Sequence, residues 1–279
     1  MKNGLVSQWM TSPVVAVSPK TFIVDARRIM NAEKIRALPV VSDEKVVGIV
    51  TWRGLLRTDL SAVNGVALTK EISIKEKRVE DIMTVNPIGT FPNSLMPKAA
   101  RVMLENKITA LPVFNDQRGA LGILTTSDIF RFILAELPEL KRTLHVSDYM
   151  NDEVVTINSD TSLLEAQRLM GTKRIRVLLV IDEEKLSGLV TRTDMMKIVP
   201  SRFALPHNQE QSLAVMLQSV EKVMTSRLLT VTPEQPLLKA AELMLEHKIH
   251  SLPVVGAEGE LLGIITESDL FRMVVQKFL

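Results

Sequence analysis

KIRALPVVSDEKVVGIVTWRG, at residues 34–54, contains landmarks that return three more times along the chain. The equivalent stretches start at Lys107, Arg174 and Lys248 and read KITALPVFNDQRGALGILTTSD, RIRVLLVIDEEKLSGLVTRTD and KIHSLPVVGAEGELLGIITESD. Each has a short apolar run, a polar turn, and a Gly followed by two apolar residues and a Thr. Two short apolar runs joined by a polar turn are typical of a β-hairpin. Recurrence of the whole pattern indicates a repeated structural unit.

Upstream of each stretch lies a segment with helical periodicity. An Ala and a Met stand four residues apart, which puts both on one helix face. These pairs are Ala26 and Met30, Ala99 and Met103, Ala166 and Met170, and Ala240 and Met244. Polar residues next to Pro or Ser are expected to mark helix starts. The candidates are Ser18-Pro19, Asn158-Ser159 and Thr232-Pro233. A further Met opens each copy, at Met10, Met83, Met150 and Met224.

The predicted fold class is α/β, with four β-α-β-β-α units. One copy of about 60 residues would bury little core, so the copies are expected to pair. Longer segments separate the first copy from the second and the third from the fourth, which divides the chain into pairs at 1–141 and 142–279. The predicted boundaries are 1–60 for repeat 1, 61–76 for a linker, 77–141 for repeat 2, 142–199 for repeat 3, 200–217 for a linker and 218–279 for repeat 4.

Composition excludes several classes of protein. The 279 residues are 46% hydrophobic and 24% charged, which is typical of a globular chain. The absence of Cys excludes disulfides and suits a reducing compartment. A net charge of +2, with no run of five like charges, argues against nucleic-acid and membrane partners. The N-terminus lacks an apolar signal core, and we expect a cytoplasmic protein.

A polar signature ends three of the four copies at the point where a strand should lead into a helix. It reads Thr-x-Ser/Thr-Asp and ends at Asp128, Asp194 and Asp269, whereas the first copy has Gly54 at this position. A carboxylate suits the cis-diol of a sugar, and hydroxyls with first-turn N–H groups suit an anion. Thr with an acid three residues later is also an ordinary capping box. Recurrence does not separate the two interpretations, because duplicated units inherit caps too.

A second position varies just before the middle strand. Its residues are Arg36, Thr109, Arg176 and His250. Three of these are potential cations beside a largely apolar strand, where a charge needs a partner. The residues two positions earlier are interpreted as cations at helix C-termini: Lys34, Lys107, Arg174 and Lys248. Cations also follow the Asp or Gly position by three residues and suit either a phosphate or an exposed helix surface: Arg57, Arg131, Lys197 and Arg272.

These features together resemble the cystathionine-β-synthase (CBS) domain, over nearly the whole chain. The opening Met-Thr, the ALPVV strand and the Gly-apolar-apolar-Thr-x-x-Asp ending are the matching motifs. Such domains pair into Bateman modules, and two modules commonly form a disc. The chain is similar in plan to the nucleotide-sensing γ subunit of AMP-activated protein kinase. The third copy departs from the pattern with Leu179 in place of Pro, and the first has Trp52 beside its Thr.

The resemblance implies a role for each signature residue. The ribose-binding residues are Asp128, Asp194 and Asp269. The phosphate-binding residues are Thr125, Ser127, Thr191, Thr193, Thr266, Ser268, Arg36, Arg176 and His250. The adenine pocket has Ile35, Ile175 and Ile249.

Sites of the family are shared between paired repeats. The resemblance therefore implies that each acid faces the pocket of its partner: Asp128 faces Ile35 and Arg36, Asp194 faces Ile249 and His250, and Asp269 faces Ile175 and Arg176. The remaining combination joins Gly54 to Thr109 and lacks both the acid and the cation, so we expect that site to be vacant or altered.

The expected function is non-catalytic regulation through binding of AMP, ADP or ATP, with no required cofactor, in a homodimer that acts on an unidentified protein. The alternatives are a ligand-free scaffold and a binder of another adenosine compound such as S-adenosylmethionine. An enzyme is not expected, because no P-loop, Rossmann or zinc-helix motif is present. His247 and His250 have no acidic or Cys partner at a metal-binding spacing, so no metal site is expected.

Overall fold

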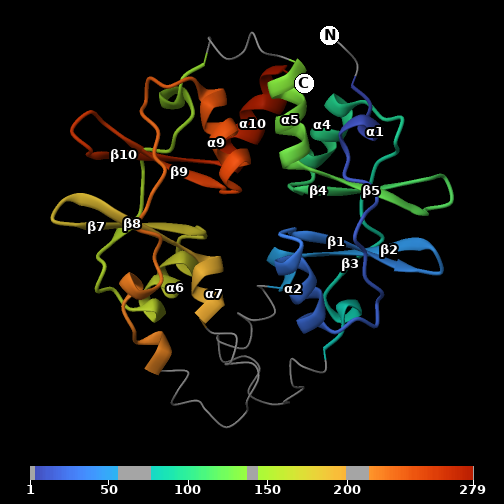
Figure 1. Cartoon of the computed structure of the whole chain (residues 1–279), viewed down its shortest axis with the longest axis horizontal. Coiled ribbons are helices and arrows are strands. Elements are labelled where there is room, and N and C mark those ends of the chain that lie inside the picture. The colour runs from blue at the N-terminus through green and yellow to red at the C-terminus, as the bar shows by residue number, and fades with distance from the viewer. Residues whose placement is uncertain (1–3, 56–76, 137–143, 199–213, 279) are drawn as a thin grey trace. The chain divides into compact units, whose positions relative to one another are not determined.

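The computed structural model describes residues 4–55, 77–136, 144–198 and 214–278. The chain divides into two compact units, Met1–Glu136 with Val275–Leu279, and Leu137–Val274 (Figure 1). The predicted linker 61–76 and most of 200–217 lie outside the described residues. The disc expected from the family resemblance stays a prediction.

The first unit contains two copies of the repeat. The first copy has α1 (Val6–Trp9), α2 (Ile23–Ala32), β1 (Ala37–Ser42) and β2 (Lys45–Thr51). The second has the 3₁₀ turn η2 (Val79–Asp81), β3 (Thr84–Val85), α4 (Met96–Glu105), β4 (Ala110–Phe114), β5 (Ala120–Thr125) and α5 (Thr126–Glu136).

The second unit repeats this arrangement. The third copy has η4 (Val146–Asp148), β6 (Thr156–Ile157), α6 (Leu163–Thr172), β7 (Val177–Asp182), β8 (Lys185–Thr191) and α7 (Arg192–Ile198). The fourth has η6 (Val220–Lys222), α9 (Leu237–His247), β9 (Ser251–Val255), β10 (Leu261–Thr266) and α10 (Glu267–Phe278). A short parallel pairing precedes the first long helix of each copy, as in β6 with β7. The predicted α/β class and the predicted β-α-β-β-α order are confirmed.

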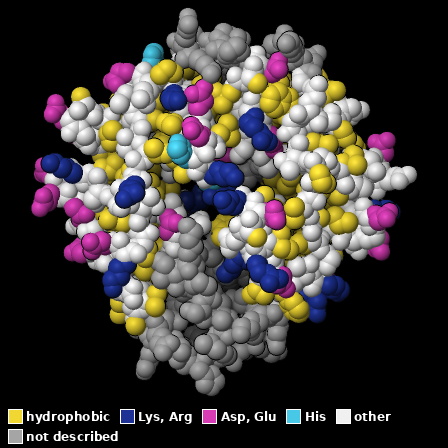
Figure 2. Space-filling view, viewed as in Figure 1, with side chains coloured by type: hydrophobic (Ala, Val, Ile, Leu, Met, Phe, Trp, Pro, Cys, Tyr) yellow, Lys and Arg dark blue, Asp and Glu magenta, His cyan; other side chains and the backbone are white. Residues whose placement is uncertain are grey.

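The middle of each copy is an antiparallel hairpin. In copies one and three the hairpin turn has two residues with positive φ, Asp43-Glu44 and Glu183-Glu184, as in type I′ turns that match the twist of the strands. Copies two and four use the longer turns 115–119 and 256–260, which accommodate their extra residue. Acidic side chains gather at hairpin tips on the face shown in Figure 2.

The opening segment of each copy pairs with the hairpin of its partner copy. Thr84 in β3 lies opposite Ile49 in β2. The equivalent antiparallel bridges are Thr11 with Ile123, Asn151 with Ile264, and Thr225 with Leu189. Copies one and two therefore exchange these segments within the first unit, and copies three and four exchange them within the second.

The recurring Gly makes this exchange sterically feasible. A Cβ built on Gly48 would lie 2.5 Å from Met83 Sδ, and one on Gly188 would lie 2.6 Å from Met224 Sδ. On Gly263 the Cβ would lie 2.8 Å from the carbonyl oxygen of Asn151. Since backbone cannot yield as a flexible side chain does, a larger residue at Gly263 would displace the partner's segment.

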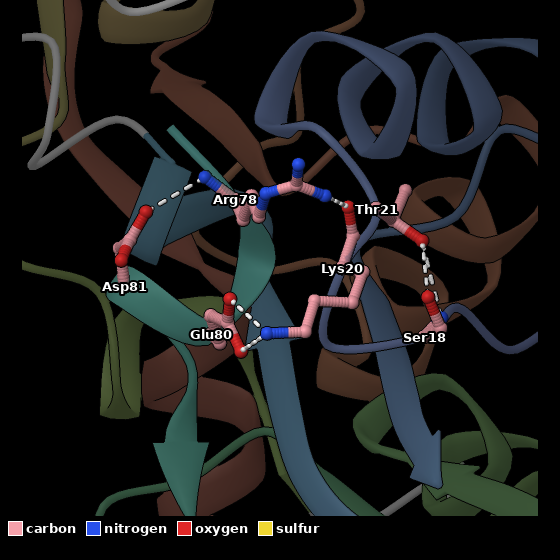
Figure 3. A network of polar contacts seen from close by, with 6 residues as sticks. All are labelled: Ser18, Lys20, Thr21, Arg78, Glu80 and Asp81. Carbon is pink, nitrogen blue, oxygen red and sulfur yellow. Dashed lines mark hydrogen bonds and ion pairs between the residues drawn. The ribbon is translucent and has the colours of Figure 1, made fainter. Parts of the chain in front are cut away.

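A second crossing lies where the chain enters repeat 2 (Figure 3). The amide of Val79 donates to the carbonyl oxygen of Thr21 at 2.8 Å. Lys20 Nζ lies 3.0 and 3.1 Å from the two carboxylate oxygens of Glu80, and Arg78 Nη1 donates to the carbonyl oxygen of Lys20 at 2.7 Å. The corresponding bridges in the other copies are Leu5 with Leu95, His145 with Pro236, and Ser162 with Ser219. These bonds tie the entry of one copy to the helix start of its partner.

The predicted helix starts at Ser18, Asn158 and Thr232 are wrong. The helices α2, α6 and α9 begin five residues later in each case. The predicted caps instead open turns, in which the carbonyl oxygen of Ser18 accepts from the amide of Thr21 at 3.1 Å and that of Asn158 from Thr161 at 3.1 Å. Polar residues next to Pro favour such turns as readily as helix caps. In α6 the cap is Ser162, whose side chain accepts from the amide of Glu165 at 3.2 Å.

The apolar cores support both the copies and their pairing. In the first copy α2, β1 and β2 enclose a buried cluster that includes Met30, Leu38 and Val50. A separate cluster joins the hairpins of copies one and two: Ala37, Ile49, Ala110 and Ile123. Ala37 and Ala110 directly follow the variable positions 36 and 109, so these positions border the contact between the copies.

We expect Gly263→Ala to destabilise the protein by about 1–3 kcal/mol, because the added methyl would collide with the backbone of Asn151. Gly171→Ala, in α6 of the same unit, is the matched control. Nothing lies within 4 Å of its built Cβ, so we expect a gain of about 0.5–1 kcal/mol from the lower entropy of the unfolded chain. Urea unfolding followed by circular dichroism measures both. Equal stability of the two variants would contradict the exchanged-segment packing.

Candidate functional site

The predicted acids lie at the corners where a hairpin ends and a helix begins. Asp269 Oδ2 accepts from the amide of Thr266 at 3.1 Å and from its hydroxyl at 2.6 Å. Asp194 makes the same bonds with Thr191 at 3.1 and 2.5 Å, and Asp128 with Thr125 at 2.6 and 2.8 Å. The geometry of the capping interpretation is therefore present at all three corners.

The capping bonds use one oxygen of each carboxylate. All six bonds use Oδ2, whereas a carboxylate has about four lone-pair positions over its two oxygens. The capping bonds also hold the carboxylate in a fixed orientation. The Thr hydroxyl hydrogens, however, point at the acids. The phosphate-binding role of Ser127, Thr193 and Ser268 stays a prediction.

Asp128 differs from the other two acids. It is 1% exposed, and its Oδ1 accepts from Arg131 Nη2 in an ion pair. Asp194 and Asp269 are half-buried. A sugar would have to displace Arg131 to reach Asp128. Of the other cations at this position, Arg272 is exposed, while Arg57 and the side chain of Lys197 lie outside the described residues.

The first copy has a corner without an acid. The amide of Gly54 donates to Thr51 Oγ1 at 3.1 Å, as the amide of Asp194 does to Thr191 Oγ1 at 3.2 Å in the third copy. Thr109 is exposed, and its carbonyl oxygen accepts from the amide of Thr126 at 3.2 Å.

Each variable residue is joined to the residue after the signature Thr of its own copy. The amide of the residue after the Thr donates to the carbonyl oxygen of the variable residue. The four bonds are Trp52 to Arg36 at 2.7 Å, Thr126 to Thr109 at 3.2 Å, Arg192 to Arg176 at 3.0 Å, and Glu267 to His250 at 2.9 Å. Two side chains therefore stand together at the same end of each hairpin. The sequence pattern did not point to this second residue, although the register of the hairpin offers a signal for it.

The pair in the third copy is doubly basic. Arg192 Nη2 lies 3.4 Å from the carbonyl oxygens of both Met170 and Ile175. Burial lowers the pKa of Arg192 from its usual value, and the nearby charge of Arg176 lowers it further. Two guanidinium groups thus lie close together at this end of the hairpin.

The pair in the fourth copy combines a base and an acid. His250 Nδ1 and Glu267 Oε2 form a short polar contact, and the side chains are 33% and 19% exposed. In the absence of a ligand, His250 Nδ1 is therefore already in contact with Glu267. Its sequence neighbour Ile249 is half-buried, as Ile35 and Ile175 are in their own copies.

A side-chain hydrogen bond crosses between copies three and four. Arg176 Nη2 donates to Ser268 Oγ at 3.4 Å. This bond brings the variable position of copy three to the first helical turn after the corner of copy four, one residue from Asp269. The pairings of Asp128 with Arg36 and of Asp194 with His250 stay predictions.

The described residues contain no group of three or more His, Asp or Glu that could hold a metal ion. His247, the second histidine of the predicted pair, is exposed at the end of α9. Over the same part of the chain, every helix is too short or too polar to cross a bilayer.

Comparison with known proteins gives matches along the whole chain. The family model of the CBS domain matches residues 6–61, 79–135, 146–201 and 220–276. Protein MJ1225 of Methanocaldococcus jannaschii is 29% identical over 271 residues, which cover 93% of this chain and 94% of that protein. Its crystal structure, described as that of a proposed archaeal homolog of g-AMPK, covers 97% of this chain and 99% of its own with a TM-score of 0.80.

Two further matches differ in extent. An uncharacterised conserved protein from Pyrococcus horikoshii has the same fold, with 23% identity, a TM-score of 0.66, and coverage of 97% of this chain and 100% of its own. Inosine-5'-monophosphate dehydrogenase of Korarchaeum cryptofilum is 36% identical over 117 residues, which are 42% of this chain and 22% of that enzyme. The latter match covers too little of the enzyme to transfer its activity.

We expect Gly54→Asp to stabilise the first unit more than Gly54→Ala does. Both replace a flexible residue, but the Asp can accept the bonds that Asp194 and Asp269 accept in their copies. A built Cβ at this position lies 3.5 Å from Thr51 Oγ1, which is ordinary contact. The difference between the variants should be about 1 kcal/mol in favour of Asp, measured by thermal unfolding at pH 7. A variant with Asp that is no more stable than the one with Ala would refute the corner geometry.

Proposed function

Because the chain belongs to the CBS domain family through four repeats, we propose that it is a regulatory protein that binds AMP, ADP or ATP between paired repeats. The supporting observation is the bond from Arg176 to Ser268, which joins the variable cation of one repeat to the acidic corner of its partner. A site shared between repeats needs these groups close together.

At this site each part of an adenine nucleotide would meet suitable chemistry. Asp269, held by Thr266, would accept hydrogen bonds from the ribose hydroxyls. The half-buried Ile175 offers apolar surface to the base. Arg176, Ser268 and the first amides of α10 would bind phosphate, because a helix N-terminus favours negative charge. We propose the same arrangement for Asp194 with Ile249 and His250, and for Asp128 with Ile35 and Arg36.

The proposed role is regulation rather than catalysis. A ligand shifts an equilibrium only between states that it binds with different affinity. Because each site would draw on two repeats, nucleotide would favour the arrangement in which the repeats are paired. We propose that a homodimer presents this arrangement to a regulated protein. Native mass spectrometry of protein purified without added nucleotide reports both the subunit count and any retained ligand.

We expect calorimetric titration to show binding of at least one of AMP, ADP and ATP at millimolar affinity or better. Asp269→Asn should weaken binding at its site about tenfold or more, because the amide accepts less strongly and presents its N–H₂ to the diol. The Asn oxygen can still accept from Thr266, so the folded state should lose little stability. Asp194→Asn is expected to behave in the same way at the other site of this unit.

The matched control is Asp160→Asn, which removes one carboxylate from an exposed turn of the same unit. It should leave both affinity and stability unchanged. A ligand-free scaffold predicts no heat with any nucleotide and no rise in melting temperature at high ligand concentration. If the protein binds S-adenosylmethionine and no nucleotide, the ribose-binding role of the corner acids would stand. The phosphate-binding role of Arg176 and Ser268 would then be wrong.

A further inference from the structure

The residue after the signature Thr has a position fixed by its backbone and a side chain that differs in every copy. Its amide bonds to the carbonyl oxygen of the variable residue in all four copies, at 2.7 to 3.2 Å. The resulting pairs are Arg36 with Trp52, Thr109 with Thr126, Arg176 with Arg192, and His250 with Glu267. Their formal charges differ: the third pair has two positive charges, and the fourth combines an acid with a titratable base.

The two pairs of the second unit offer the sharpest contrast. We call the group Arg176, Arg192, Ser268 and Asp269 the Arg176 site, and the group His250, Glu267 and Asp194 the His250 site. At the Arg176 site, Arg192 Nη2 lies 3.4 Å from the carbonyl oxygens of Met170 and Ile175. Burial and, second, the charge of Arg176 lower the pKa of Arg192. Like charges held together favour the arrival of an anion.

At the His250 site the opposite holds. Glu267 contacts His250 Nδ1 directly, so this carboxylate lies beside the group expected to bind phosphate. A phosphate bound by His250 would therefore also lie near the negative charge of Glu267. Such repulsion is how a site discriminates against a more highly charged ligand.

We propose that the residue after the signature Thr sets how many phosphates each site accepts. On this view, which rests on the proposed function, Arg192 makes the Arg176 site select ATP or ADP over AMP. Glu267 limits the His250 site to AMP or a less charged adenosine compound. Both are specificity-determining residues, and Glu267 also positions the imidazole of His250.

The test isolates the two sites before measuring them. The double variant Asp128→Asn with Asp194→Asn leaves the Arg176 site intact, and Asp128→Asn with Asp269→Asn leaves the His250 site intact. Adenosine, AMP and ATP are titrated calorimetrically into each without divalent cations. We expect ATP to bind the Arg176 site at least about tenfold more tightly than AMP, and AMP to bind the His250 site at least as tightly as ATP.

Substitutions then assign the difference to single residues. Arg192→Gln should reduce the ATP preference of the Arg176 site about tenfold, and Arg192→Lys should retain most of it. Glu267→Gln should raise the affinity of the His250 site for ATP about tenfold relative to AMP. Adenosine should bind equally in each variant and its parent, since it has no phosphate to sense the change.

The matched controls are Arg174→Gln and Glu258→Gln, which remove the same charges from exposed positions outside both pairs. Neither should alter the ratio of ATP to AMP affinity. Thermal unfolding without ligand checks that each variant folds, and the Lys variant separates charge from packing at position 192.

Two kinds of failure are distinguishable. If the isolated sites bind nucleotides with the same ratio of ATP to AMP affinity, and Arg192→Gln and Glu267→Gln leave that ratio unchanged, this inference is wrong while the proposed function stands. If the wild-type protein binds none of adenosine, AMP, ADP and ATP, the proposed function itself is wrong.

Discussion

The close approach of a Met-containing segment to a Gly on the partner repeat underlies the rest of the structure. At Gly48, Gly188 and Gly263 the incoming segment occupies the space that a Cβ on the strand would need. Neither hairpin of a pair can therefore form its full set of contacts alone. This exchange is what places the corner of one repeat beside the variable position of its partner, as Ser268 and Arg176 show.

The corner acids combine a structural role with the proposed role in ligand binding. A capping Asp is oriented by two bonds to the same Thr. The capping and ribose-binding interpretations are therefore compatible, because both require a fixed carboxylate at the same turn. Asp128 illustrates the limit, since Arg131 occupies its second oxygen and burial excludes water. A ribose would therefore have to displace Arg131 before it could bind Asp128.

The sequence predicted what depends on local pattern and repetition. The strand order and the Thr-to-Asp corner follow from periodicity and spacing, so they could be read directly. The starts of α2, α6 and α9 could not, because the polar residues before them form turns that compete with capping. The contacts of Glu267 with His250 and of Arg131 with Asp128 were also missed, since a side chain's choice among charged neighbours depends on three-dimensional placement.

The residue after the signature Thr can differ among copies because its structural role is a hydrogen bond made by its backbone amide. The bond from its amide to the carbonyl oxygen of the variable residue is the same for Trp52, Thr126, Arg192 and Glu267. Side-chain identity at this position therefore leaves the hairpin register intact. Duplicated repeats can thus keep the same backbone structure and have different charges beside the proposed ligand site. The corner acid is the same in three copies, whereas the residue after the signature Thr differs in every copy. On the proposed function, this difference would let a single chain distinguish adenosine compounds by their phosphates.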